Sequence, residues 1–336
     1  FRLALEETGV PYAYISDQDV RSDADLKAKY DVIIFPPVTS NISTLINGVR
    51  KRMLDDGSDF NGPIPWKDSE LTPNLAGNDE TDDIRGGLGF AGLANLKKFI
   101  EDGGVFIPIT ASTSLPIELG MTEGVSITET RQLAARGSIV NATVDDKASP
   151  IAYGYDDKLS VYFSQSPVFR VSLPGVGFGG GGGGGAGAGA RTAGRGSSSD
   201  PDIPQGRPWE HPEREPRRSR AEQETYVDPD IREFLAGTLL PQRMWPRVVL
   251  RFARANDLWV SGMLEGGSEL AEAPAVVDVP VGRGHVVLFA TNPMWRHETH
   301  GSFMLLLNAA MHFDNLQAGR IEKPEADAET DKAGVD

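Results

Sequence analysis

Residues that could support hydrolysis occur in two polar turns, far apart in the chain. Ser112 follows the apolar run 105–109, and His297, Glu298 and His300 follow a second apolar run near the end. A serine hydroxyl, an imidazole base and a carboxylate that orients the base are the parts of a hydrolase or acyl-transfer site. No G-x-S-x-G elbow surrounds Ser112, which favours the alternative that it only caps a helix and hydrogen-bonds its turn.

The same histidines could also bind a metal. His297 and His300 stand three apart and could share an ion on a helix, but no third ligand accompanies them. The chain has no cysteine, and no histidine is followed three residues later by glutamate, so thiolate sites and the His-x-x-Glu pair are both excluded. We therefore predict no metal and no cofactor in this chain, and a structural role for both histidines.

Two further residues of this loop are candidates for an interface or structural role. Asn292 opens an Asn-Pro turn, and Arg296 precedes His297. An arginine here could pair with a carboxylate of a partner domain or with an internal Asp or Glu. We favour the internal pair.

An amphipathic helix and a buried strand should position the first turn. Apolar residues recur with helical spacing over 90–101, and Gly103 and Gly104 then provide a stop before the strand at 105–109. Upstream, the residues before Gly9 read as a helix. Runs 11–16 and 31–35 read as adjacent parallel strands, the second apolar enough to be buried on both faces, with a short helix between them.

Strands dominate the second half of the pattern. We expect strands at 137–144, 159–163, 168–171, 247–253, 258–263, 275–281 and 285–290. A tight hairpin turn is expected at 282–284, and a final helix over 302–313 with Ser302 as its cap. This order predicts one α/β domain formed by residues 1–173 and 245–316.

Two segments lack the apolar content of a folded core. Residues 174–225 include seven consecutive glycines and many prolines and charges, and we predict a disordered insertion, followed by a return segment at 226–244. The acidic stretch 317–336 is predicted to be a disordered tail. The net charge of −15 argues against a nucleic-acid partner. The sequence has no run of about 18 apolar residues, so we predict no membrane span.

The stretches 86–112 and 284–315 together resemble the C-terminal glutamine-amidotransferase-like domain found behind the catalytic domain of large bacterial zinc carboxypeptidases. The resemblance implies a flavodoxin-like parallel sheet with additional strands. In such a sheet the helix ending near Gly9 follows a central strand, so we expect that the first strand is missing by truncation. It also implies a zinc-dependent exopeptidase as the parent protein, exported to the periplasm or beyond, with zinc in its N-terminal catalytic domain.

Three functions remain open from the sequence. The first is a non-catalytic accessory domain whose partner is its own N-terminal catalytic domain. The second is a hydrolase or acyl-transfer enzyme that uses Ser112 and His297. The third is a self-associating or surface-binding module that uses the sheet edge left by the missing strand.

Overall fold

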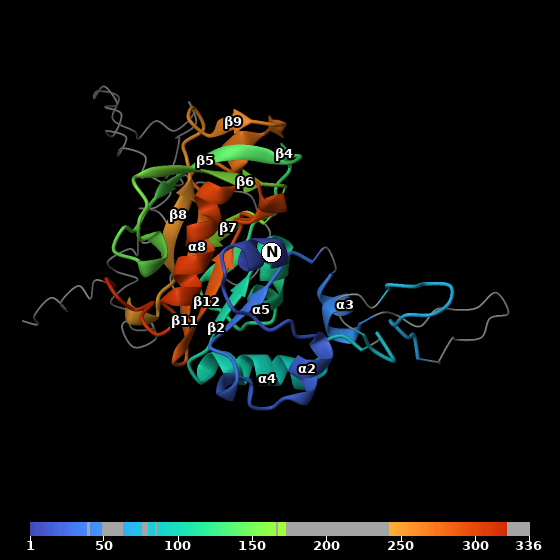
Figure 1. Cartoon of the computed structure of the whole chain (residues 1–336). Coiled ribbons are helices and arrows are strands. Elements are labelled where there is room, and N and C mark those ends of the chain that lie inside the picture. Colours follow the sequence, from blue (N-terminus) through green and yellow to red (C-terminus); the bar gives the residue numbers. More distant parts are fainter. Residues whose placement is uncertain are drawn as a thin grey trace, which may run out of the picture.

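The computed structural model describes residues 1–38, 41–48, 63–75, 80–84, 86–165, 167–172 and 242–320. The predicted insertion at 174–225, most of the return segment and the tail beyond residue 320 lie outside these residues. The described part is a mixed α/β structure built on one large sheet (Figure 1). None of its helices combines the length and the apolar character needed to cross a bilayer.

The large sheet has the strand order β1-β2-β12-β11-β8-β5-β6, and β9 also pairs with β5. Its strands are β1 (Val32–Phe35), β2 (Val105–Pro108), β5 (Ser138–Val144), β6 (Lys158–Phe163), β8 (Arg247–Phe252), β9 (Trp259–Ser261), β11 (Pro274–Val281) and β12 (Gly284–Phe289). Two small sheets pair β3 (Val125–Ile127) with β7 (Phe169–Val171) and β4 (Ala134–Ala135) with β10 (Leu264–Glu265).

Three neighbouring strands of the large sheet are parallel, and the remaining pairings are antiparallel. β2 lies between β1 and β12 and is parallel to both, with Val105 opposite Val32 on one side and His285 on the other. From β12 onward every pairing is antiparallel. The β11–β12 pair is closed by the predicted turn, where Gly282 has φ 60°. The expected α/β class is therefore confirmed, and the large sheet consists of a three-stranded parallel part joined to a larger antiparallel part.

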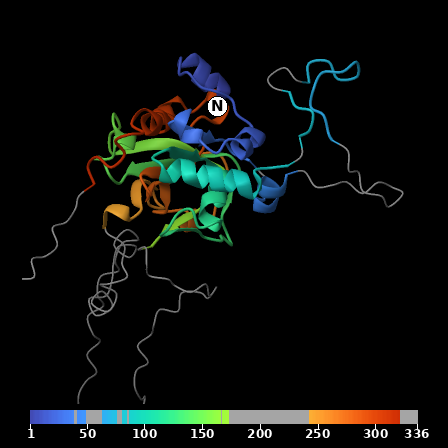
Figure 2. The same ribbon diagram turned by 90° about the horizontal axis from the view of Figure 1, so that it is seen from below.

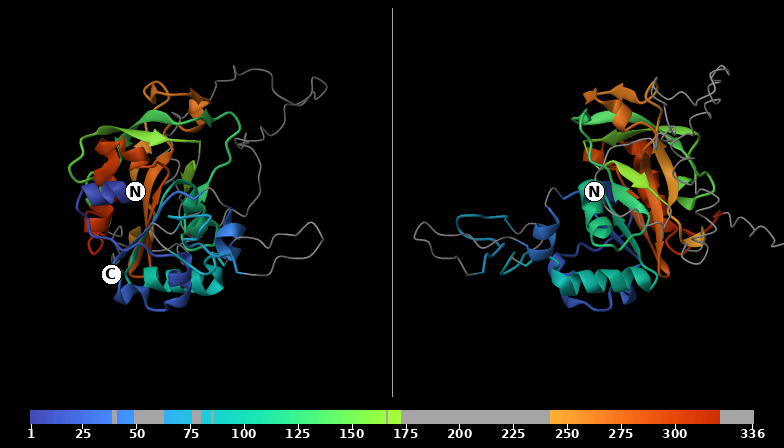
Figure 3. Two further views of the ribbon diagram at one scale, coloured as in Figure 1. Left: turned by 45° about the vertical axis from the view of Figure 1, so that its right-hand side comes forward. Right: turned by 180° about the vertical axis from the view of Figure 1, so that it is seen from behind.

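Six α-helices accompany the sheet in the described part. They are α1 (Arg2–Glu7), α2 (Asp17–Ser22), α3 (Ile42–Asn47), α4 (Gly89–Glu101), α5 (Ser114–Glu118) and α8 (His300–Met311). Short 3₁₀ turns are η1 (Leu26–Ala28), η2 (Thr110–Thr113), η3 (Pro150–Ala152), η4 (Gln242–Met244), η5 (Gly267–Glu269) and η6 (Trp295–His297). Figure 2 shows α1 and α8 together on one side of the sheet, and the view from behind in Figure 3 brings α5 to the front on the other.

Helix α4 and strand β2 form as the sequence predicts. The apolar stripe of α4 is buried, with Phe99 and Ile100 almost fully inaccessible, and all four residues of β2 are buried. Gly103 follows the helix at φ 105°, and a Cβ on Gly104 would lie 2.4 Å from the Phe99 ring. The two glycines therefore let the chain leave the helix and pass against its own last turn.

The prediction of a strand over residues 11–16 is wrong. The segment has no strand pairing, and Tyr12 and Tyr14 are 39% and 65% exposed. Tyr12 is held instead by α1, since its hydroxyl donates to Glu6 (2.8 Å) and accepts from Arg2 (3.1 Å). A β-rich run becomes a strand only when a neighbouring strand pairs with its backbone, and no described strand pairs with this one.

The prediction that 31–35 is buried on both faces is also wrong, for the same reason. Strand β1 is at the sheet edge, and each of its four residues is only half-buried. Between runs 11–16 and 31–35, where a short helix is predicted, the structure has α2 followed by η1. α2 begins at a capping box in which Ser16 and Asp19 bond each other's backbone N–H groups.

Helix α8 begins before its predicted start, and Ser302 is not its cap. Thr299 occupies the N-cap position, but its hydroxyl donates to the carbonyl oxygen of Pro293 (2.9 Å) and does not cap the helix; the buried Ser302 hydroxyl lies 2.7 Å from the same oxygen. Tyr155 also anchors this helix, as its hydroxyl donates to Gly301 (2.8 Å), and burial raises its pKa to about 12. The start of α8 is thus fixed by contacts with distant loops.

A buried ionic cluster ties the segment after α8 to the sheet. Asp278 of β11 is fully buried, 2.6 Å from Nδ1 of His285 and 2.7 Å from Nη2 of Arg320. Arg320 also donates to the carbonyl oxygen of Trp245 (2.8 Å). Residues 317–320 therefore belong to the folded domain, and the boundary predicted at 316 is too early.

We expect Arg320→Met to lower the free energy of unfolding by about 3 to 5 kcal/mol, because it leaves a buried carboxylate with one cationic partner removed. Urea unfolding at pH 7 measures this. The matched control is Arg254→Met, whose exposed pair with Glu272 should change stability by less than about 0.5 kcal/mol. Equal effects of the two substitutions would contradict the structural role of Arg320.

Stability should also fall in acid through Asp278. Burial alone would raise the pKa of Asp278, but the charges and hydrogen bonds of His285 and Arg320 outweigh it and hold the pKa below its usual range. A lowered folded-state pKa stabilises the fold above the unfolded value of about 3.9, and this contribution is lost as pH falls further. Urea midpoints between pH 7 and pH 3 should therefore fall less steeply below pH 4 in Asp278→Asn than in the unsubstituted chain.

Candidate functional site

The polar turns predicted from the sequence lie at the same edge of the sheet. β2 and β12 are parallel neighbours, and Ile109 and Phe289 form a parallel bridge at their carboxyl ends. The turn that carries Ser112 therefore starts beside the loop that carries His297. Open α/β sheets commonly bind ligands at this edge, which makes the contacts of the polar side chains decisive.

Ser112 is fully buried, and both of its hydrogen bonds go to the loop after β1. Its hydroxyl donates to the carbonyl oxygen of Pro36 (2.7 Å) and accepts from the N–H of Val38 (3.1 Å). This side chain joins the exits of two neighbouring strands. The sequence predicts that Ser112 caps a helix and hydrogen-bonds its own turn, but its hydroxyl bonds a different loop and does not cap α5.

His297 contacts helix α1. Its Nε2 lies 2.7 Å from the carboxylate of Glu7, and its ring stands edge-on to those of His300 and Phe303 at 4.6 and 5.4 Å. Nε2 of His300 lies 2.9 Å from the carbonyl oxygen of His297, and Glu298 is exposed. These contacts hold the loop against α1 and the first turn of α8.

No hydrogen bond joins Ser112 to either histidine, although the structure describes all three residues. The Ser112 hydroxyl and the His297 imidazole each bind a different structural partner, Pro36 and Glu7. Within the described ranges no three His, Asp or Glu side chains are grouped as metal ligands.

Arg296 does not form the internal ion pair that we favoured from the sequence. Its guanidinium lies over the ring of Trp295 at 5.1 Å, and among the described residues it has no carboxylate partner. Trp295 in turn stacks on Tyr162, with ring centroids 4.5 Å apart. Asn292 has a structural role, since its side-chain oxygen accepts from the N–H of Met294 (3.2 Å).

Two further residues of this edge carry no signal in the sequence. Thr110 has φ 50°, which is uncommon for a β-branched residue, and Thr291 has a fully buried hydroxyl with no hydrogen-bond partner among the described residues. Both features arise from the way the chain leaves β2 and β12, so residue type alone could not reveal them.

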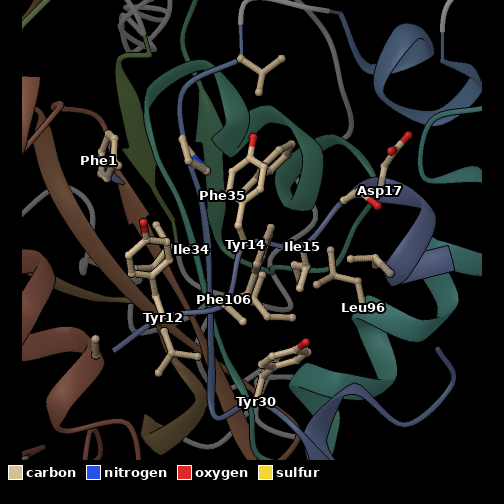
Figure 4. Close-up of a pocket in the computed structure, with 18 of the residues that line it drawn as sticks. Phe1, Tyr12, Tyr14, Ile15, Asp17, Tyr30, Ile34, Phe35, Leu96 and Phe106 are labelled. Carbon is tan, nitrogen blue, oxygen red and sulfur yellow. The ribbon is translucent and has the colours of Figure 1, made fainter. Parts of the chain in front are cut away.

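A second candidate site is a large apolar groove beside β1, with a volume of about 1200 Å³. Its walls are the segment 10–17, the outer side of β1, the start of α1, and side chains of α4 and α8. Figure 4 shows Tyr12, Ile15, Ile34 and Phe106 around this space, with Phe1 and Phe35 toward one end and Tyr30 at the other. The groove therefore follows the length of β1.

The groove exposes the unpaired edge of β1. Asp31 and Phe35 accept backbone bonds from Val105 and Ile109 on the β2 side, at 2.9 and 3.0 Å. Alternate residues of a parallel strand bond to the same neighbour, so the backbone groups of Val32 and Ile34 point away from β2 and toward the groove. No described strand pairs with this edge.

No protein-family model matches the sequence, and the comparison with curated proteins found no match. The solved structures that are similar include two cytoplasmic proteins of Salmonella typhimurium, at 12% and 10% identity and TM-scores of 0.40 and 0.38. These alignments cover 92% and 94% of this chain and 84% of each of those chains. A protein from Bacteroides uniformis described as ThuA-like has 11% identity and a TM-score of 0.31, over 67% of this chain and 64% of that one.

Since all three scores lie below 0.5, these likenesses establish neither a shared fold nor a shared function. None of the three proteins is described as a carboxypeptidase domain. The family resemblance inferred from the sequence stays a prediction.

Ser112→Ala should lower the free energy of unfolding by about 1 to 3 kcal/mol, because it leaves the buried Val38 N–H and Pro36 carbonyl without their partner. Thermal or urea unfolding measures this change. Ser160→Ala, which removes an exposed hydroxyl on β6, is the control and should stay within about 0.5 kcal/mol. If Ser112→Ala is as mild as the control, Ser112 does not hold the two loops together.

Proposed function

We propose that this chain is a non-catalytic accessory domain that packs on the catalytic part of a zinc metallocarboxypeptidase-like polypeptide. The observation that carries the proposal is the separate use of the two candidate catalytic groups. Ser112 holds the loop after β1, and His297 holds α1. A nucleophile must be free to meet its base, and here each group is bound elsewhere.

The arrangement of the parallel strands supports an amidotransferase-like, flavodoxin-like domain. α4 lies between β1 and its parallel neighbour β2 in the chain. β12 is the other parallel neighbour of β2, and α8 follows β12 in the chain. Parallel strands joined through helices are the unit from which such sheets are built. Under this proposal the antiparallel strands β11, β8, β5 and β6 correspond to the additional strands that the resemblance implies.

The loop after β12 offers a surface for the catalytic part. Arg296 is exposed, lies over Trp295 and has no carboxylate partner among the described residues. A cation supported by an aromatic stack suits recognition of a carboxylate across an interface. Under this proposal zinc belongs to the catalytic part, this chain binds no cofactor, and the parent protein is exported to the periplasm or the cell exterior.

The hydrolase alternative has less support. To act as a nucleophile, Ser112 would have to release both of its hydrogen bonds and become accessible from a fully buried position. The self-association alternative draws on the open edge of β1 and concerns the groove, a different site.

The proposal is tested on the native polypeptide purified from its source. We expect its sequence to contain a His-x-x-Glu pair in a catalytic part outside this chain, and about one equivalent of zinc per polypeptide by elemental analysis. Carboxypeptidase activity should be abolished by a chelator and should persist in Ser112→Ala, after correction for folded fraction. A native polypeptide without zinc, or one whose hydrolytic activity is lost in a folded Ser112→Ala variant, would contradict the accessory role.

A further inference from the structure

Three buried side-chain atoms near the Asp278 cluster have no hydrogen-bond partner among the described residues. They are Nη2 of Arg247, Nε of Arg320 and Oγ of Ser149. The described part of the chain has five such atoms, so three of the five belong to one small region. Buried polar atoms of folded proteins are nearly always hydrogen-bonded, and a group of three without partners therefore points to a bound species.

The two arginines lie over the same face of the sheet. Arg247 of β8 is directly opposite Asp278 of β11, so their side chains share a face. Arg320 reaches this face from the segment after α8, and its Nη2 lies 2.7 Å from Asp278. Nη1 of Arg247 donates to the carbonyl oxygen of Ala318 (2.7 Å), two residues before Arg320. Each guanidinium thus contacts a group that adjoins the other arginine.

Ser149 belongs to a loop that also holds Arg247. Asp146 of this loop accepts from Nε of Arg247 (2.6 Å), and its carbonyl oxygen accepts from the N–H of Ser149 (3.3 Å). The neighbouring Ala148 packs against the segment after α8, since a Cβ on Gly319 would lie 2.3 Å from the Ala148 carbonyl oxygen. The three side chains therefore converge where this loop, β8 and the segment after α8 meet.

The chemistry of the three atoms selects the species that would satisfy them. All three can donate a hydrogen bond, and the two guanidinium atoms cannot accept one. A water oxygen has two lone pairs and would accept from two donors, whereas an anion can accept from all three and needs no acceptor in return.

The charges of the cluster also suit an anion. A buried ion needs charges of the opposite sign close to it. His285, whose Nδ1 lies 2.6 Å from Asp278, adds a third positive charge to those of Arg247 and Arg320 when its imidazole is protonated. These three groups face the two carboxylates of Asp146 and Asp278. One bound negative charge makes the cluster neutral.

We propose that Arg247, Arg320 and Ser149 form a binding site for one small monovalent anion of the chloride class. The ion accepts hydrogen bonds from the two guanidinium groups and the hydroxyl. Because all three donor atoms are buried, the site admits a compact ion and excludes larger anions. The ion joins β8, the loop of Ser149 and the segment after α8, so its binding stabilises the folded state.

The test is the dependence of stability on the kind of anion. Urea unfolding is followed while chloride replaces gluconate at constant ionic strength, because gluconate screens charges equally but is too large for an enclosed site. Above the dissociation constant, a tenfold rise in chloride should lower the equilibrium constant of unfolding by about tenfold. Stability that does not change as chloride replaces gluconate would overturn the proposal.

Ser149→Ala separates the site from general effects of salt, because it removes one donor and leaves both arginines in place. It should raise the chloride concentration that gives half of the stabilisation by about tenfold, as expected for one hydrogen bond to a charged group. Ser160→Ala, which removes an exposed hydroxyl on β6, is the matched control and should leave this concentration unchanged. An equal response of the two variants to chloride would contradict the site.

Bromide, which resembles chloride and scatters X-rays anomalously, locates the ion directly. Crystals grown in sodium bromide should show an anomalous peak within hydrogen-bond distance of Nη2 of Arg247 and Nε of Arg320. Density of a water molecule at this position, without an anomalous peak, would show that water satisfies the donors and would overturn the anion site.

Discussion

The position of β2 between two parallel neighbours is the constraint on which the rest of the structure depends. Its four residues are buried, and its backbone pairs with β1 on one side and β12 on the other. Because β2 and β12 are in register, their exits open at one edge, and the loops that follow must be held in place there. Ser112, Asn292 and Ser302 do this through hydrogen bonds to backbone groups. The polar residues of this edge are therefore explained by loop anchoring before any chemistry is invoked.

The sequence predicts those elements whose formation depends on their own residues. Helix α4 and strand β2 were identified because an apolar stripe, a glycine stop and a buried run follow one another directly. The β11–β12 hairpin is likewise predicted from its own residues, because two apolar runs flank a glycine turn. Residues 11–16 could not be predicted in this way. Their β-rich composition is real, but strand formation needs a paired neighbour, and composition carries no information on whether that neighbour is present.

The candidate site was less predictable than the fold. Sequence patterns place Ser112 and His297 in polar turns, but their actual partners, Pro36 and Glu7, are far away in the chain. The packing of Arg296 on the Trp295 ring and the left-handed backbone of Thr110 depend likewise on how loops meet. A residue type suggests a set of possible roles, and tertiary contacts select among them. For this reason the sequence of the loop after β12 is compatible with a catalytic, a metal-binding or a structural role.

The cluster of Asp278, His285 and Arg320 has a consequence for how the chain is processed. Arg320 lies beyond the end of α8, yet its guanidinium pairs with the buried carboxylate of Asp278, which also contacts His285. A protease that cut between α8 and Arg320 would therefore remove a charge from the interior as well as a terminal peptide. Cleavage after Arg320 would leave this charge in place. The stable fragment left by limited digestion should thus retain Arg320, and its C-terminal mass would mark the true end of the folded domain.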